Sequence, residues 1–375
     1  MVYCKSTNSF FLNYRSRFMD DYSEKLKDLL ITCAKQNASD LHLGVGRRPT
    51  LRIDGTLVPL QKEPVLTPEM AEGLILALLT PEQKEKFVKD KQVDFAYSFE
   101  DKARFRVNVY FQRGYMAAAL RSIPSRIRSV DELKLPPIIH DLAKLSQGFV
   151  LVVGPAGHGK STTLAALLDE INHTRSDHII TVEDPIEYLF VQDKCIISQR
   201  EVGMDTISFG DGLRTILRQD PDVVMMGEMR DAESISTALT ASETGHLIFS
   251  TLHTNSASQT IDRIIDTFPA EQQGQVVSQL SATLVAIISQ RLLPRTSGGR
   301  AAAVEIMIVN PAIRNLIRER KIYQIDLVIE TSLQEGMMTL NRSLATLVKN
   351  KEVSLEAAEL YSLNPSELRI LLERL

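Results

Sequence analysis

The spacing of hydrophobic residues changes in character at about residue 130. Before that point, leucines at helical spacing predict a helix over 20–36, and two Thr-Pro pairs predict helices near 68–79 and 81–90. Short strand-like runs lie at 41–43, 50–53, 93–99, 104–111 and 116–121. The dipeptide at 54–55, Asp-Gly, is a hairpin turn signal. Together these elements predict a small mixed α+β domain.

Beyond that point the apolar runs are short, continuous and rich in Val and Ile, and helical segments separate them. The runs lie at 149–153, 178–182, 222–227 and 246–251. Continuous apolar strands that alternate with helices are typical of a buried parallel sheet with helices on its faces. From about residue 270 to the end, the pattern predicts mostly helix. The second domain is therefore predicted to be α/β.

Proline, serine and charged residues are concentrated in residues 122–136, which are predicted to form a linker. The predicted domains are then 20–121 and 137–375. Residues 1–19 precede the organised pattern, and they are interpreted as an N-terminal extension that is either untranslated or disordered. A chain of 375 residues is long enough for two domains of roughly 150 residues each.

Composition and charge narrow the class of protein. The hydrophobic fraction is 44% and the charged fraction is 24%, which disfavours a disordered or fibrous chain. A net charge of −4 disfavours a polycationic binder of nucleic acid or membrane. The three cysteines are far apart and fit a reducing compartment. Since no apolar run reaches the ~20 residues needed to cross a bilayer, a cytoplasmic protein is expected.

The strongest chemical signal is GPAGHGKS at 154–161, which fits G-x-x-x-x-G-K-[ST] between an apolar strand and a helix. Glycines let the backbone curl so that several N–H groups point inward, and the helix N-terminus adds a positive dipole. Lys160 is predicted to reach the β- and γ-phosphates of ATP, and the Ser161 hydroxyl to hold Mg²⁺. The predicted nucleotide-binding residues are Gly154, Pro155, Ala156, Gly157, His158, Gly159, Lys160, Ser161 and Thr162.

Two predicted strands end in carboxylates, at the edge of the sheet where ligands bind in open α/β folds. The run 222–227 leads to Glu228, which is predicted to hold Mg²⁺ or to act as a general base toward water. The run 178–182 leads to Glu183, and Pro185 stops strand pairing there. Glu228 is favoured as the base, but the sequence does not separate it from Glu183. A capping or solvated acid would give the same local pattern.

Two histidines bracket a predicted buried strand, because His246 enters it and His253 follows it. The hypothesis is that they sense the γ-phosphate and pass its state across a subunit boundary, with an ordinary structural role as the alternative. His158 lies inside the phosphate loop, where a small residue would crowd the phosphates less. A solvent-facing ring is predicted for it.

Residues 103–110 alternate as a half-buried strand that places Arg104 and Arg106 on one face, and Arg121 follows on the next strand. A planar guanidinium suits phosphate charge because it binds bidentately. These arginines are therefore candidates for a nucleotide held by the other domain. A solvated sheet face is the alternative interpretation.

Four segments occur in a characteristic order: GPAGHGKSTT, TVEDPIEY, VVMMGEMRD and ASETGHLIFSTLHT. They resemble the motifs of the secretion-type hexameric ATPases and, within that class, the PilT/PilU retraction ATPases of type IV pili. SDLHLGVGRRPTLRIDG and ARFRVNVY resemble the N-terminal domain of the same family. The resemblance extends from about residue 20 to the end. It implies a PAS-like N-terminal domain, a RecA-like P-loop ATPase domain and a ring of six chains.

The resemblance also implies residue roles. Lys160 and Ser161 correspond to Walker A, Glu228 to Walker B and Glu183 to the acidic-box glutamate. The histidine-box pair and the arginines that approach a nucleotide at the domain junction correspond to His246, His253, Arg104, Arg106 and Arg121.

The expected function is a hexameric motor that hydrolyses ATP with Mg²⁺ to drive pilus retraction and twitching motility. The expected location is the inner face of the bacterial inner membrane, and a membrane platform protein of the pilus is the expected partner. Contact with the membrane is expected only through partners. A RecA-like DNA translocase lacks support because no basic tract with interleaved aromatics is present, so nucleic acid is not an expected partner.

Features of two branches coexist in the sequence. The segment 311–319 resembles the PilT type, which is linked to retraction. By contrast, 111–121 and the tail 364–375 resemble PilU, which implies an accessory ATPase that assists a catalytic paralogue. The branch therefore stays open. Pilus assembly or type II secretion ranks lower, because such relatives typically carry a longer N-terminal region and a four-cysteine zinc motif.

Overall fold

The computed structural model describes residues 7–36, 38–53, 55–99, 103–123 and 126–374. The chain forms two compact units, Met1–Arg126 and Ile127–Leu375, and the division falls within the range 122–136. Each unit is described by itself below. Among the described residues, no helix combines the length and the apolar character that a membrane crossing requires.

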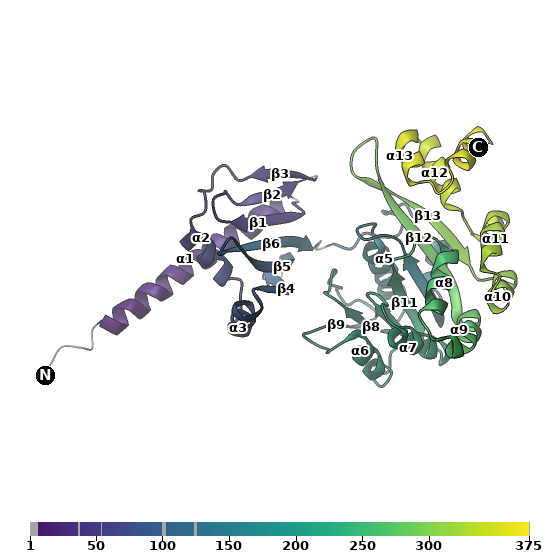
Figure 1. The fold of residues 1–375 in the computed structure, drawn as a ribbon, viewed down its shortest axis with the longest axis horizontal. Coiled ribbons are helices and arrows are strands. Elements are labelled where there is room, and N and C mark those ends of the chain that lie inside the picture. Colours follow the sequence, from purple (N-terminus) through teal and green to yellow (C-terminus); the bar gives the residue numbers. More distant parts are fainter. Residues whose placement is uncertain (1–6, 37, 54, 100–102, 124–125, 375) are drawn as a thin grey trace. The chain divides into compact units, whose positions relative to one another are not determined.

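The first unit is a mixed α+β fold, as predicted (Figure 1). Its described residues form an antiparallel six-stranded sheet in the order β3-β2-β1-β6-β5-β4. The strands are β1 (Asp40–Gly44), β2 (Thr50–Ile53), β3 (Thr56–Pro59), β4 (Gln92–Phe99), β5 (Ala103–Gln112) and β6 (Tyr115–Ile123). The helices are α1 (Thr7–Lys35), α2 (Pro68–Leu76) and α3 (Pro81–Asp90).

Local sequence signals account for several boundaries in this unit. Thr67 and Thr80 are the N-caps of α2 and α3, and each helix has proline in its first turn, as predicted. Strands β2 and β3 pair as the predicted hairpin, and Gly55 in its turn has a positive φ. Asp54 lies outside the described residues. The backbone of α1 begins at Thr7, so this helix includes part of the predicted extension 1–19.

The second unit contains a seven-stranded sheet, in the order β13-β12-β7-β11-β10-β8-β9 within the described residues. Every pairing is parallel except β12 with β13, so the prediction of a buried parallel sheet is confirmed. The strands are β7 (Gly148–Val153), β8 (His178–Glu183), β9 (Ile196–Glu201), β10 (Val223–Met226), β11 (Leu247–Leu252), β12 (Leu284–Pro294) and β13 (Arg300–Ile308).

Helices cover both faces of this sheet. Successive side chains of a strand point to opposite sides, so each buried strand contacts helices on both faces. On β7, Phe149 and Leu151 pack into the cluster that includes α7, α8 and α9, whereas Val150 and Val152 pack against α4 and α5. The helices are α4 (Ile138–Ala143), α5 (Lys160–Thr174), α6 (Phe209–Ile216), α7 (Ala232–Glu243), α8 (Ala257–Asp266), α9 (Ala270–Thr283), α10 (Pro311–Arg318), α11 (Ile325–Thr331), α12 (Leu340–Lys349), α13 (Leu355–Tyr361) and α14 (Pro365–Arg374).

The prediction of mostly helix beyond residue 270 is wrong for residues 284–308. They form the long hairpin of β12 and β13, which extends the sheet next to β7. The apolar run of β12 is too short to separate strand from helix by periodicity. The signal that favours a strand is its content of β-branched residues, followed by the turn residues Ser-Gly-Gly at 297–299.

Candidate functional site

The predicted phosphate loop connects β7 to α5, so it lies at the carboxyl edge of the parallel strands. Gly154, Gly157 and Gly159 all have positive φ, a conformation that favours glycine. At Gly154 a Cβ would lie 2.5 Å from the backbone oxygen of Gln290, so a side chain does not fit there. Helix α5 starts at Lys160 with a glycine N-cap. Its first N–H groups therefore have no side-chain cap and suit an anion.

Lys160 is buried, and its ammonium group folds back onto the loop. Nζ donates to the backbone oxygens of Gly154 at 2.9 Å and Pro155 at 3.1 Å. Burial lowers the pKa of Lys160, while the charges of Glu228 and Glu187 oppose that shift. A phosphate oxygen would offer this buried cation a charged acceptor in place of two neutral carbonyls.

Glu228 follows β10 and lies at the same edge of the sheet as Lys160. His253 links the two side chains. The ring of His253 lies between them, with Nδ1 at 3.4 Å from Lys160 Nζ and Nε2 at 3.2 Å from Glu228 Oε2. Because Lys160 can only donate, the network assigns Nδ1 as acceptor and Nε2 as donor. His253 lies between Lys160 and Glu228 because it follows β11, which lies between β7 and β10 in the sheet.

Arg230 forms an ion pair with Glu228. Partial burial acts to raise the pKa of Glu228, but the hydrogen bonds and charges of Arg230 and His253 outweigh it and lower that pKa. Glu228 is therefore a carboxylate held in its ionised form near the phosphate loop. In that form it can accept a proton from water or coordinate a cation through its oxygens.

Glu183 ends β8 in a different environment. Its carboxylate is buried and accepts hydrogen bonds from Thr181 Oγ1 at 2.7 Å, Gln199 Nε2 at 3.2 Å and the backbone N–H of Glu187 at 3.4 Å. Burial raises its pKa, and these hydrogen bonds oppose the shift. None of these three donors belongs to the phosphate loop, whereas His253 links Glu228 to Lys160. The arrangement therefore favours Glu228 over Glu183 as the base.

His246 is not part of this cluster. It precedes β11, whereas His253 follows it, so the two histidines lie at opposite ends of the strand. Nδ1 of His246 lies 2.9 Å from the backbone oxygen of Ala241 in α7. Its role at a subunit boundary stays a prediction.

The three predicted arginines lie in the first unit. Phe105 and Val107 of β5 are buried while Arg106 is exposed, so the predicted alternation is confirmed. Arg106 pairs in register with Arg121 of β6, and Arg121 Nε forms an ion pair with Asp40 at 3.1 Å. Their approach to a nucleotide, like that of Arg104, stays a prediction.

The sequence did not indicate the contacts between β12 and the loop, because β12 was expected to be helical. Gln290 Nε2 donates to the backbone oxygen of His158 at 2.9 Å, and Gln290 Oε1 accepts from Thr163 Oγ1 at 2.7 Å.

The Thr162 hydroxyl lies 2.8 Å from that of Tyr188. A cavity of about 300 Å³ opens beside the loop. Its polar lining comes from Arg128, Glu132, Thr162, Thr163, Gln290, Arg295 and Arg300.

The prediction of a solvent-facing His158 ring is wrong. The residue is half-buried, and Nδ1 accepts a hydrogen bond of 2.9 Å from the backbone N–H of Leu292. Burial, followed by the positive charges of Arg291, Lys160 and Arg300, lowers the pKa of His158. The ring thus faces strand β12.

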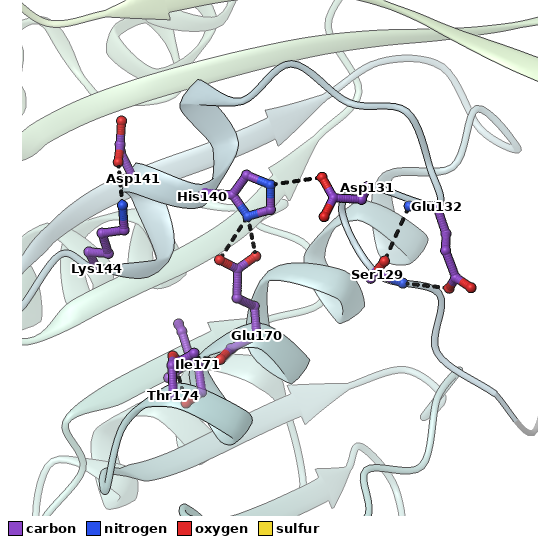
Figure 2. A network of polar contacts seen from close by, with 9 residues as sticks. All are labelled: Ser129, Asp131, Glu132, His140, Asp141, Lys144, Glu170, Ile171 and Thr174. Atoms are coloured by element: carbon purple, nitrogen blue, oxygen red, sulfur yellow. Dashed lines mark hydrogen bonds and ion pairs between the residues drawn. The ribbon is translucent and has the colours of Figure 1, made fainter.

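Helix α5 is anchored at its far end by a polar cluster (Figure 2). Nδ1 of His140 in α4 lies 2.8 and 2.9 Å from the two carboxylate oxygens of Glu170 in α5, and Nε2 lies 3.2 Å from Asp131. Because both partners are acceptors, both ring nitrogens carry protons in this arrangement. The hydrogen bond with Glu170 is the main cause of a raised His140 pKa, with Asp131 adding to it and burial opposing it.

A raised pKa makes the stabilising effect of this cluster depend on pH. The contribution is complete below about 6.5, the pKa of an unfolded histidine, and is lost as the pH rises through the higher folded-state value. We expect His140→Gln to lower the free energy of unfolding by about 1 kcal/mol at pH 6 and by less at pH 8.5. Denaturant unfolding of both proteins at the two pH values measures this. An equal difference at pH 6 and pH 8.5 would contradict the assignment.

Comparisons with known proteins show which family this chain resembles. The model of the family described as type II/IV secretion system protein matches residues 20–298. The type IV pilus retraction ATPase PilT of Pseudomonas aeruginosa is 46% identical over 333 residues, which are 89% of this chain and 96% of that protein. The type IV pilus ATPase PilU of the same organism is 38% identical over 351 residues, which are 93% of this chain and 91% of that protein.

A solved structure resembles most of the chain. The crystal structure of the pilus retraction motor PilT with bound ADP superposes with a TM-score of 0.86 at 48% identity, covering 93% of this chain and 99% of that chain. The family match spans most of the chain, and the relatives cover nearly all of it. The protein therefore belongs to the type II/IV secretion system protein family, which includes the pilus ATPases PilT and PilU.

Proposed function

We propose that this protein is an ATP-hydrolysing motor that drives the retraction of type IV pili. The observation that carries the proposal is the line of contacts from Lys160 through His253 to Glu228, which brings a cation and a carboxylate together beside a glycine loop. The 46% identity to PilT supports pilus retraction as the work that hydrolysis performs.

The proposed chemistry uses groups of this chain at each step. The loop N–H groups and Lys160 would hold the phosphates of ATP, and the Ser161 hydroxyl would hold Mg²⁺, with Glu228 contacting the ion through water. Among the described residues, no three His, Cys, Asp or Glu side chains gather as metal ligands, which fits an ion held largely by phosphates and water. Bound Mg²⁺ would neutralise charge on the β- and γ-phosphates.

Glu228 would orient a water molecule and accept its proton as the oxygen attacks the γ-phosphorus and the bond to the β-phosphate oxygen breaks. Lys160 would stabilise the negative charge that develops during this transfer. The cavity of about 300 Å³ lies beside Gly159 and Thr162 and has a polar lining. It would receive the rest of the nucleotide.

The assembly is the part of the proposal that follows from family resemblance. Six copies would form a ring at the cytoplasmic face of the inner membrane and act on a platform protein of the pilus. Arg104, Arg106 and Arg121 would approach the nucleotide at a domain junction. Guanidinium groups suit that role because they bind phosphate oxygens bidentately.

A PilU-type accessory ATPase is the second candidate, favoured by the 38% identity to PilU over 93% of this chain. Both candidates predict ATP hydrolysis, so purified chain tests the shared claim by phosphate release combined with native mass. A hexamer that hydrolyses ATP supports the motor assignment, and an inactive monomer contradicts it. Deletion of the gene separates the two candidates. Loss of retraction indicates the main motor, and normal retraction with a paralogue present indicates the accessory role.

A further inference from the structure

His158 has an unusually large side chain for its position in the phosphate loop, and the proposed chemistry uses no atom of that side chain. We propose that His158 is a positioning residue whose neutral ring fastens the phosphate loop to strand β12 and thereby sets the affinity for nucleotide. The proposal rests on the proposed function and adds to it a determinant of affinity.

The ring acts where strand pairing ends. Strands β12 and β7 pair in parallel as far as Ser289 opposite Val153, which is the last residue of β7. Strand β12 continues to Pro294 and needs another acceptor on that side. The backbone N–H of Leu292 donates to Nδ1 of His158 at 2.9 Å. The imidazole nitrogen thus replaces the backbone acceptor that β7 would offer to Leu292 if that strand continued.

Two further contacts hold the loop to the same hairpin. Gln290 Nε2 donates to the backbone oxygen of His158 at 2.9 Å, and Arg300 Nη1 donates to that of Gly157 at 3.2 Å. Gly154 also lies against β12, because a Cβ there would come within 2.5 Å of the backbone oxygen of Gln290. The loop geometry that presents N–H groups to an anion therefore depends on contacts with β12 and β13. His158 supplies the contact that comes from a loop side chain.

The contact requires an unprotonated Nδ1, because a backbone N–H is a donor. The ring is therefore the neutral tautomer with its proton on Nε2. The charged or titratable groups that face it are Arg291 of β12, Arg300 of β13, Lys160 of α5 and Tyr361 of α13, whose ring centroid lies 6.0 Å away. The three cations and partial burial favour the neutral ring. Protonation would place two donors against each other and release the loop from Leu292.

The test compares variants that keep or remove the acceptor. His158→Asn keeps it, since the asparagine Oδ1 lies close to the position of Nδ1, whereas His158→Leu and the smaller His158→Ala remove it. Binding of ADP with Mg²⁺ to the full chain is measured by calorimetry at pH 7.5, with steady-state hydrolysis in parallel. We expect both acceptor-free proteins to bind ADP about tenfold more weakly and to raise KM for ATP similarly. H158N should bind ADP within about twofold of wild type, because it keeps the acceptor.

A pH series adds a second readout. Wild-type affinity for ADP should fall as the pH is lowered below about 6.5, the ordinary pKa of histidine, because the ring gains a proton, and the affinity of H158N should fall less. Unchanged affinity in both acceptor-free proteins, or an H158N protein as weak as H158L, would overturn this inference alone. A wild-type chain that binds no ADP would instead overturn the proposed function, and this inference with it.

Discussion

Replacement of Lys160 by alanine is expected to lower ATP turnover by at least about a thousandfold. Lys160 is the buried cation of the phosphate loop, and its Nζ lies against the loop oxygens where it can turn toward a phosphate. Without it, charge that develops on the β- and γ-phosphates during transfer would lack its nearest side-chain partner. Phosphate release by the purified protein at saturating ATP measures the effect.

A matched control is available at Lys144, the residue that follows α4. Lys144 pairs with Asp141 at 2.8 Å, and its side chain is 72% exposed. We expect Lys144→Ala to keep wild-type turnover, because surface ion pairs contribute little to stability. The Lys160→Ala protein should keep the native mass and circular dichroism spectrum of the wild type. Continued hydrolysis by that folded protein would show that the phosphate loop is not the site of reaction.

Replacement of Glu228 by glutamine is expected to reduce kcat by about 10²–10⁴-fold while ATP binding is retained. Glutamine keeps the size of the side chain and its contact with His253 but cannot accept a proton from water. Glu183→Gln is the matched comparison, because that carboxylate is buried and already accepts three hydrogen bonds from the protein. We expect Glu183→Gln to lose much less activity.

Single-turnover hydrolysis and binding of ATP measured on the same preparations separate the two carboxylates. The expected result is a Glu228→Gln protein that binds ATP and holds it unhydrolysed. A larger loss of the chemical step in Glu183→Gln would reverse the assignment of the base. Equal binding in all three proteins is needed for either conclusion.

Features governed by local chemistry were predictable from sequence. The phosphate loop is set by glycine conformations and by its place between a strand and a helix, and both are found at Gly154–Lys160. The approach of Glu228 toward the loop follows from parallel strands, whose carboxyl ends share one edge. The Thr67 and Thr80 caps follow from the same kind of short-range signal.

Features that depend on distant segments were not predictable. The position of His253 between Lys160 and Glu228 requires the order β7-β11-β10, which periodicity does not specify. Strand β12 was missed, and with it the contacts of Gln290 and Leu292 with the loop. The His140–Glu170 pair joins two helices that are separated in sequence by the loop itself. In each case contacts between segments that are distant in sequence determine the position of the residues, and local propensity does not.

The most direct measurement is a structure of this protein with Mg²⁺ and a non-hydrolysable ATP analogue. The account predicts the triphosphate inside the loop at 154–161, with Lys160 Nζ turned from the Gly154 carbonyl to within about 3 Å of a phosphate oxygen. It also predicts the Glu228 carboxylate facing the γ-phosphate through water or the metal ion. A triphosphate bound elsewhere, or Glu228 turned away from it, would contradict the account.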